Sequence, residues 1–133
     1  MKINANGIDI NYEIEGEGPV VTFSHSLACN LSMWDEQVRA LKSRYRVLRY
    51  DTRGHGQTAA PTGAYSLDQL ADDLKGLLDG LGIRETHFVG LSMGGMIGQV
   101  FALKHPATVQ SLTLCDTTSR YASGAAAIWE ERI

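Results

Sequence analysis

Ser92 has the setting in this chain that most clearly favours covalent chemistry. It is the central residue of Gly-Leu-Ser-Met-Gly at residues 90–94, which matches the pattern G-x-S-x-G. A serine on a sharp turn between a strand and a helix can attack a carbonyl carbon once a base removes its proton. A β-type run at 86–91 precedes this serine, and an apolar helical pattern begins at about Met93. The alternative is a serine that only caps a helix in a glycine-rich turn.

Acyl transfer also requires two N–H donors for the negative oxygen that forms in the transition state. The Met93 N–H would stand at a helix N-terminus, where free N–H groups favour an anion. The loop that follows the third strand, residues 24–27, would supply the second donor, and the Leu27 N–H is the candidate. We expect His25 to organise this loop rather than to act as the base; an ordinary loop with a buried histidine is the alternative.

The elements that would position these residues alternate between strand and helix. Asn6-Gly7 lies between two alternating segments and predicts an antiparallel hairpin. From about residue 19 onward, short β-type runs separated by helical patterns predict a parallel sheet with crossover helices. The expected class is therefore α/β, with a mostly parallel sheet, an N-terminal antiparallel hairpin and helices on both faces. The expected strands are 1–5, 8–14, 20–23, 46–50, 86–91 and 109–115, and the expected helices are 33–43, 67–81, 93–104 and one from 125.

Local signals refine these elements. The segment 67–81 carries one leucine-rich face, and its aspartates, including Asp73, point elsewhere. Ser66 is its expected N-cap, and Ser32 is the expected N-cap of the helix before it. In the loop after the fourth strand, Asp51 is expected to organise the turn and to pair with Arg53.

Taken together, these motifs resemble the α/β-hydrolase family. The resemblance rests on residues 23–27 after the third strand, 51–58 after the fourth and 90–96 after the fifth. The last part of the chain, residues 114–133, is more similar to 3-oxoadipate enol-lactonases than to the family at large. Ser26 stands where the family pattern usually has His-Gly, and the enol-lactonase branch tolerates a serine there.

The resemblance implies a catalytic triad in the chain order serine, acid, histidine, with both partners after Ser92. Residues 1–133 would then be the N-terminal portion of one α/β-hydrolase domain, with the lid starting at about 121. His105 follows Ser92 but lies at the far end of the expected helix, about 18 Å away at the helical rise per residue, and cannot be the base. Asp116, where some branches place the acid, is expected to cap a loop.

The function expected from these residues is hydrolysis of a carboxylic ester or lactone through an acyl-enzyme on Ser92. The resemblance implies a small substrate, with His25, Ser26 and Trp129 as candidate pocket residues, and no metal or other cofactor. The missing acid and base leave three explanations open: a second chain carries the C-terminal fragment, the chain is truncated, or a short protein has lost catalysis. The alternative functions are a non-catalytic ligand-binding protein of this fold and a perhydrolase or haloperoxidase-type enzyme.

Composition excludes several other classes. The chain has 133 residues, of which 44% are hydrophobic, and a net charge of −3, which suits a globular domain and not a disordered tail. A pI near 5.7 makes nucleic acid a poor partner. No apolar run approaches the roughly 18 residues that span a membrane, and the N-terminus lacks the apolar region of a signal peptide. The two cysteines are too few for a disulfide framework and have no metal-binding spacing. We therefore expect a cytoplasmic protein.

Overall fold

The computed structural model describes residues 1–121 and 123–132, the last four of these by their backbone alone. Its centre is one six-stranded sheet with the strand order β1-β2-β4-β3-β5-β6. Strand β5 ends at the residue before Ser92, so the central strands of the sheet lead directly to the candidate nucleophile. The strands are β1 (Lys2–Ala5), β2 (Ile8–Glu15), β3 (Val20–Ser24), β4 (Arg46–Tyr50), β5 (Thr86–Leu91) and β6 (Val109–Cys115).

The direction of the strands confirms the expected mixed sheet. Strands β1 and β2 form an antiparallel hairpin, and β2 pairs antiparallel with β4. The turn residues Asn6 and Gly7 have φ values of 50° and 80°, as the tight turn of a two-residue hairpin requires. The pairs β4–β3, β3–β5 and β5–β6 are all parallel. The carboxyl ends of β3, β4, β5 and β6 therefore meet at one edge of the sheet.

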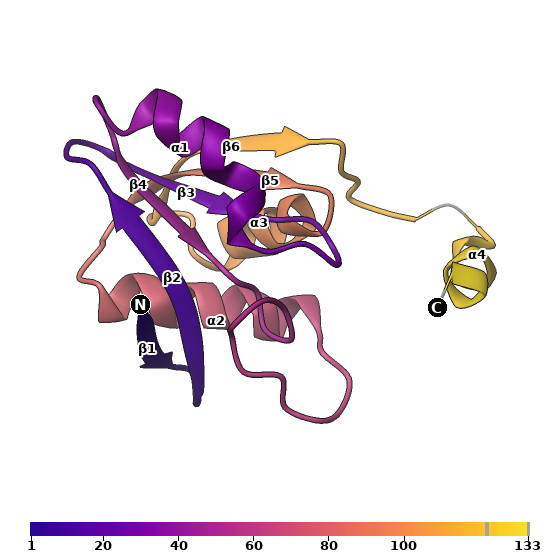
Figure 1. The fold of residues 1–133 in the computed structure, drawn as a ribbon. Helices are drawn as coiled ribbons and strands as arrows, with labels where there is room; N and C mark the ends of the chain where they lie inside the picture. The colour runs from indigo at the N-terminus through magenta and orange to yellow at the C-terminus, as the bar shows by residue number, and fades with distance from the viewer. Residues whose placement is uncertain (122, 133) are drawn as a thin grey trace.

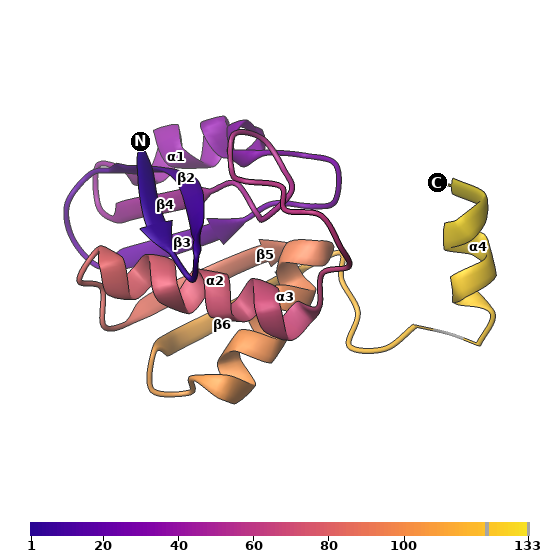
Figure 2. The same cartoon turned by 90° about the horizontal axis from the view of Figure 1, so that it is seen from below.

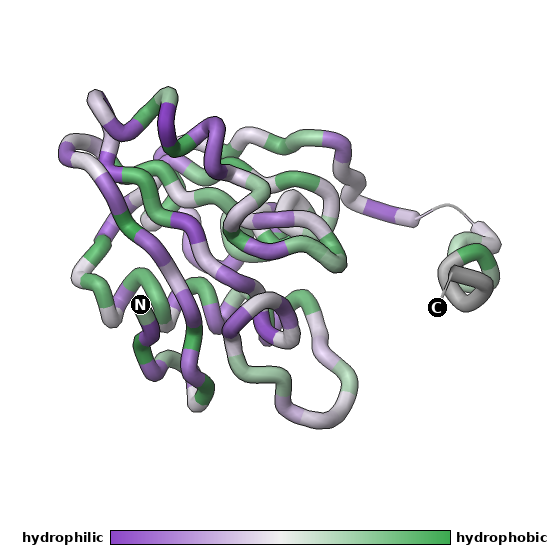
Figure 3. Tube along the Cα trace, viewed as in Figure 1, coloured by the Kyte–Doolittle hydropathy of each residue, from purple (hydrophilic) through white to green (hydrophobic). Residues whose placement is uncertain are grey.

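Helices cover both faces of this sheet, as expected. The helices α2 (Leu67–Gly80) and α3 (Met93–Lys104) lie on one face, and α1 (Asp35–Leu41) lies on the other (Figure 1; Figure 2). The larger core lies between the sheet and α2 and α3, and includes Leu74, Phe88 and Phe101, each fully buried. The hydropathy trace shows apolar stretches along the inner strands and the facing helix turns (Figure 3). Burial of these apolar faces is the main stabilising term of the fold.

The helical segment after β3 differs from its expected form. A 3₁₀-helix, η1 (Leu31–Trp34), comes first and leads into the shorter α1. The expected N-cap Ser32 is wrong, because the Asn30 side chain accepts a hydrogen bond from the Ser32 N–H at 2.9 Å. Asparagine and serine are both good caps, so their spacing alone did not decide between them. By contrast Ser66 caps α2 as expected, accepting from the Gln69 N–H at 3.1 Å.

A buried ion pair ties the loop after β4 to α2. The Arg53 guanidinium donates from Nε and Nη2 to the two carboxylate oxygens of Asp73, at 2.8 and 2.7 Å. Asn6 adds a third bond to the same carboxylate, at 2.9 Å. The expected pairing of Arg53 with Asp51 is therefore wrong, and Asp73 points into the molecule rather than to solvent. A bidentate pair satisfies both charges where water is excluded.

The last strand and helix lie at the edge of the molecule. Strand β6 is the edge strand on the side opposite β1, and Leu114 on it is 42% exposed. The helix α4 (Ala125–Arg132) lies apart from the sheet in both ribbon views (Figure 1; Figure 2). Among the described residues, no helix has the length and apolar character needed to cross a membrane.

Candidate active site

Ser92 lies on a strained turn between β5 and α3. Its φ and ψ are 53° and −113°, a conformation that a residue with a side chain adopts only when its surroundings enforce it. Glycines allow the close approach that this turn needs. A Cβ on Gly90 would lie 2.4 Å from the Gly94 carbonyl oxygen, and a Cβ on Gly94 would lie 2.1 Å from the Ser24 carbonyl oxygen. The motif therefore packs the start of α3 directly against β5 and β3.

Ser92 lines an open cleft, and its hydroxyl has no partner in the described residues. In particular, the hydroxyl does not cap α3. This geometry disfavours the interpretation of Ser92 as a simple capping residue. The cleft has a volume of about 250 Å³ and is lined by Leu27, Ser92, Met93, Met96 and Tyr121. The two residues expected to supply oxyanion donors thus lie beside the candidate nucleophile.

His25 belongs to the loop after β3. Its ring is fully buried, and its Nε2 accepts a hydrogen bond from the Thr52 N–H at 2.9 Å. Because Nε2 is an acceptor, the neutral ring carries its proton on Nδ1, which donates to the Ser26 carbonyl oxygen at 2.8 Å. Burial lowers the pKa of His25 below its usual 6.5, which favours this neutral form. The ring holds the loop and is not among the residues lining the cleft.

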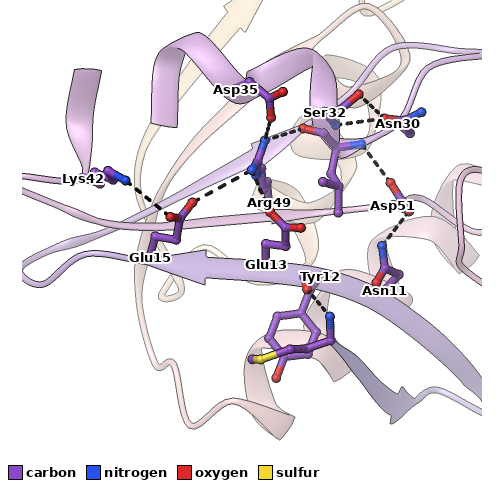
Figure 4. Close-up of polar contacts among 12 residues, drawn as sticks. Asn11, Tyr12, Glu13, Glu15, Asn30, Ser32, Asp35, Lys42, Arg49 and Asp51 are labelled. Atoms are coloured by element: carbon purple, nitrogen blue, oxygen red, sulfur yellow. Dashed lines mark hydrogen bonds and ion pairs between the residues drawn. The ribbon is translucent and has the colours of Figure 1, made fainter. Parts of the chain in front are cut away.

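At the C-terminal end of this loop, both the backbone N–H and the backbone carbonyl of Leu31 are hydrogen-bonded. The Leu31 N–H donates to the buried Asp51 carboxylate at 2.8 Å, and the Leu31 carbonyl accepts from Arg49 at 3.1 Å. Figure 4 shows Asp51 beside Asn11, which donates to it at 2.9 Å. It also shows Arg49 among acidic side chains, Glu13 at 2.7 Å being one of them. Arg49 and Asp51, at the end of β4, therefore hold the C-terminal end of this loop.

The two other candidate pocket residues, Ser26 and Trp129, are not among the residues that line the cleft in the described part of the chain. The Ser26 hydroxyl donates to the Cys29 sulfur at 3.1 Å, and Ser26 is half-buried but does not line the cleft. The backbone of Trp129 belongs to α4, and its side chain lies outside the described residues. The sequence did not single out Met96 and Tyr121. Helical periodicity could have found Met96, because it follows Ser92 by four residues and so lies on the same face of α3.

None of the four histidines contacts the Ser92 hydroxyl through a hydrogen bond. His55 bonds the Arg53 carbonyl at 3.1 Å, and His87 bonds the Ser111 hydroxyl at 2.7 Å. His105 ends α3 and packs against Phe101. Asp116 lies just after β6 with a φ of 43°. Within the described residues, no group of three or more His, Cys, Asp or Glu side chains is placed to hold a metal ion.

The chain belongs to the α/β-hydrolase fold family, whose sequence pattern it matches over residues 19–131. The resemblance seen in the three motifs is thereby confirmed.

The chain is similar to enol-lactonases and to carbamate hydrolases. The chain is 39% identical to 3-oxoadipate enol-lactonase 2 of Acinetobacter baylyi over 98% of its own length and 49% of that protein. It is 34% identical to a putative carbamate hydrolase of Azorhizobium caulinodans over 84% of its length and 42% of that protein. An enol-lactonase structure from Burkholderia xenovorans LB400 superposes with a TM-score of 0.93 and 43% identity, over 99% of this chain and 52% of that one. The chain thus spans about half the length of the curated relatives it matches.

Proposed function

We propose that this chain carries the nucleophile and the oxyanion donors of a serine hydrolase that acts on carboxylic esters or lactones. The observation that carries the proposal is the conformation of Ser92, which lines a cleft together with Leu27 and Met93 and does not cap α3. A left-handed backbone at a serine costs about 1–3 kcal/mol, and such strain persists where it serves a mechanism. A serine that only capped a helix would need no such turn.

The reaction would proceed through an acyl-enzyme. Ser92 Oγ attacks the substrate carbonyl carbon and gives its proton to a histidine, while the N–H groups of Leu27 and Met93 bind the oxyanion. The alcohol or enol group leaves with that proton. Water then attacks the acyl carbon, the histidine takes the proton of that water and returns one to Ser92 Oγ, and the acid is released. Neither His25 nor any other histidine of this chain bonds the serine, and we therefore propose that the base lies outside residues 1–133.

We further propose that residues 1–133 form the N-terminal portion of one hydrolase domain, completed by a C-terminal part that supplies the acid and the histidine. Two observations support this. The chain spans about half of its relatives. Strand β6 is a sheet edge with no charged residue and no proline, which are the usual means of protecting an edge from pairing. We propose that this part is carried by a second chain, a C-terminal fragment of the same protein.

The cleft favours a small substrate. Its residues are apolar apart from Ser92 and the Tyr121 hydroxyl, and its volume of about 250 Å³ suits a compact ring or a short ester. The enol-lactonases among the relatives support a small lactone, which this resemblance suggests is acidic.

A fluorophosphonate probe tests the nucleophile, because it forms a covalent adduct only with an activated serine. We expect labelling of the complete assembly at Ser92, loss of labelling in Ser92→Ala, and normal labelling in the control Ser119→Ala, which alters an exposed serine of the same chain. An intact-mass spectrum of the same sample shows whether a C-terminal fragment accompanies the chain. Complete absence of labelling would instead support a non-catalytic ligand-binding protein.

A perhydrolase or haloperoxidase-type activity would share the labelling. It is distinguished by comparing product formation from a carboxylic ester with and without hydrogen peroxide. Hydrolysis in water alone supports the esterase, whereas turnover that depends on peroxide supports the alternative.

A further inference from the structure

The segment after β6 holds the Ser92 turn through two hydrogen bonds. The Ser92 N–H donates to the Cys115 carbonyl oxygen at 3.0 Å. Two residues further on, the Thr117 hydroxyl donates to the Ser92 carbonyl oxygen at 2.7 Å. Both polar backbone groups of the strained serine are therefore bonded to one short segment. The sequence motif around Ser92 contains neither of these partners.

The side chain of Thr117 is also closely packed. A Cβ on Gly95 would lie 2.7 Å from the Cβ, Cγ2 and Oγ1 atoms of Thr117, so this glycine makes room for the threonine against the first turn of α3. The next residue takes part as well, since the Thr118 carbonyl accepts from Gln99 on α3 at 3.1 Å. The position of the Thr117 hydroxyl is thus fixed by packing, and not only by its own hydrogen bond.

The bond to Ser92 matters because of peptide geometry. The Ser92 carbonyl and the Met93 N–H are the two ends of one planar trans peptide, so they point in opposite directions. A donor that holds the carbonyl therefore also sets the direction of the N–H. Hydrogen bonding at a carbonyl also strengthens the N–H of the same peptide as a donor. The Met96 N–H bonds this carbonyl too, at 3.1 Å, as part of the regular helix.

The loop after β3 repeats this arrangement. The Ser26 carbonyl and the Leu27 N–H belong to one peptide, and that carbonyl accepts from His25 Nδ1 at 2.8 Å and from the Cys29 N–H at 3.2 Å. Each of the two proposed oxyanion donors thus belongs to a peptide whose carbonyl accepts one side-chain and one backbone hydrogen bond. The side chains, His25 and Thr117, come from different parts of the chain.

We infer that Thr117 is a positioning residue of the active site, which aims the Met93 N–H and stabilises the Ser92 turn through its hydrogen bond to the Ser92 carbonyl. The inference rests on the proposed hydrolase function. It gives the segment after β6 a part in transition-state stabilisation, although Thr117 itself contacts no substrate.

The test compares side chains that differ by one group, in the complete active protein, with p-nitrophenyl acetate as substrate. Thr117→Val replaces the hydroxyl by a methyl of similar size, and Thr117→Ser keeps the hydroxyl and removes the methyl. We expect kcat to fall about 10-fold in Thr117→Val with KM within about twofold, because an oxyanion donor acts mainly in the transition state. Thr117→Ser should retain kcat within about threefold, since one aligned hydrogen bond remains.

Thr62→Val is the control. Thr62 is an exposed threonine in the loop before α2 and does not line the cleft, so its change should leave kcat unchanged. Should Thr117→Val fail to fold, Thr117→Ala and Thr117→Ser provide the same comparison, because they differ by a single oxygen.

Equal losses in the hydroxyl-free and hydroxyl-bearing variants, or a wild-type kcat in folded Thr117→Val, would overturn the inference. Failure of the proposed function gives a different result: wild-type protein that does not hydrolyse the ester, or Ser92→Ala that hydrolyses it as fast as wild type.

Discussion

Replacing Gly94 by alanine should damage the site strongly, because the turn leaves no space for a Cβ at this position. The new Cβ would lie 2.1 Å from the Ser24 carbonyl oxygen and 2.9 Å from that of His25. Ordinary contacts are about 3.5 Å, so α3 and the end of β3 must separate by about 1 Å or more. Both neighbours are backbone atoms of the central sheet and its loop, and they cannot rotate away as a side chain would.

This separation should reduce both catalysis and stability. The Met93 N–H is carried by α3 and the Leu27 N–H by the loop after β3, so the displacement moves the two oxyanion donors apart. A misplacement of about 1 Å can reduce kcat about 100-fold. The overpacked contact should lower the free energy of unfolding by about 1–3 kcal/mol. A fall in kcat of about 100-fold corresponds to about 2.7 kcal/mol in the activation free energy, so the two effects are of similar size and need separate measurements.

Steady-state hydrolysis of p-nitrophenyl acetate and urea unfolding measure the two effects in the complete protein. Gly76→Ala is the matched control, because Gly76 lies inside α2 away from the cleft and its added Cβ would be 3.3 Å from the Ala5 side chain and the Asn6 nitrogen. Alanine gains helix propensity there, so we expect unchanged kcat and stability within about 1 kcal/mol of wild type. A Gly94→Ala protein with wild-type kcat would refute the role given to this close approach.

Two further predictions concern buried polar groups. Arg53→Met or Asp73→Leu alone should each lower the free energy of unfolding by about 3–5 kcal/mol, since each leaves a buried charge without its partner. The double variant should lose clearly less than the sum, and additive losses in urea unfolding would contradict the pairing. Burial lowers the pKa of His25 from 6.5, so the unfolded chain takes up the proton first; its contribution to stability is therefore full above about pH 6.5 and decreases as the pH falls below that value. The difference in unfolding free energy between wild type and His25→Asn should thus shrink from about pH 7.5 to about pH 5.5, and a constant difference would exclude this titration.

The local elements followed from short-range patterns. The strands Arg46–Tyr50, Thr86–Leu91 and Val109–Cys115 and the helix Met93–Lys104 have the predicted bounds, because apolar periodicity and flanking turn residues both marked their ends. The short helix after β3 was less well predicted, since Asn30 and Ser32 are competing caps two residues apart. The strand-to-helix change around Ser92 was visible because the glycines and the serine are adjacent in sequence.

The sequence by itself thus determined the α/β class, the family and the position of the candidate nucleophile, all of which depend on patterns within a few neighbouring residues. The tertiary structure decided which distant groups meet. It pairs Arg53 with Asp73 instead of Asp51, and it brings Thr117 to the Ser92 carbonyl across 25 positions of the chain. Such pairings depend on how the helices pack on the sheet. Their hydrogen bonds are stronger in a water-poor interior, and that interior exists only once the core has packed.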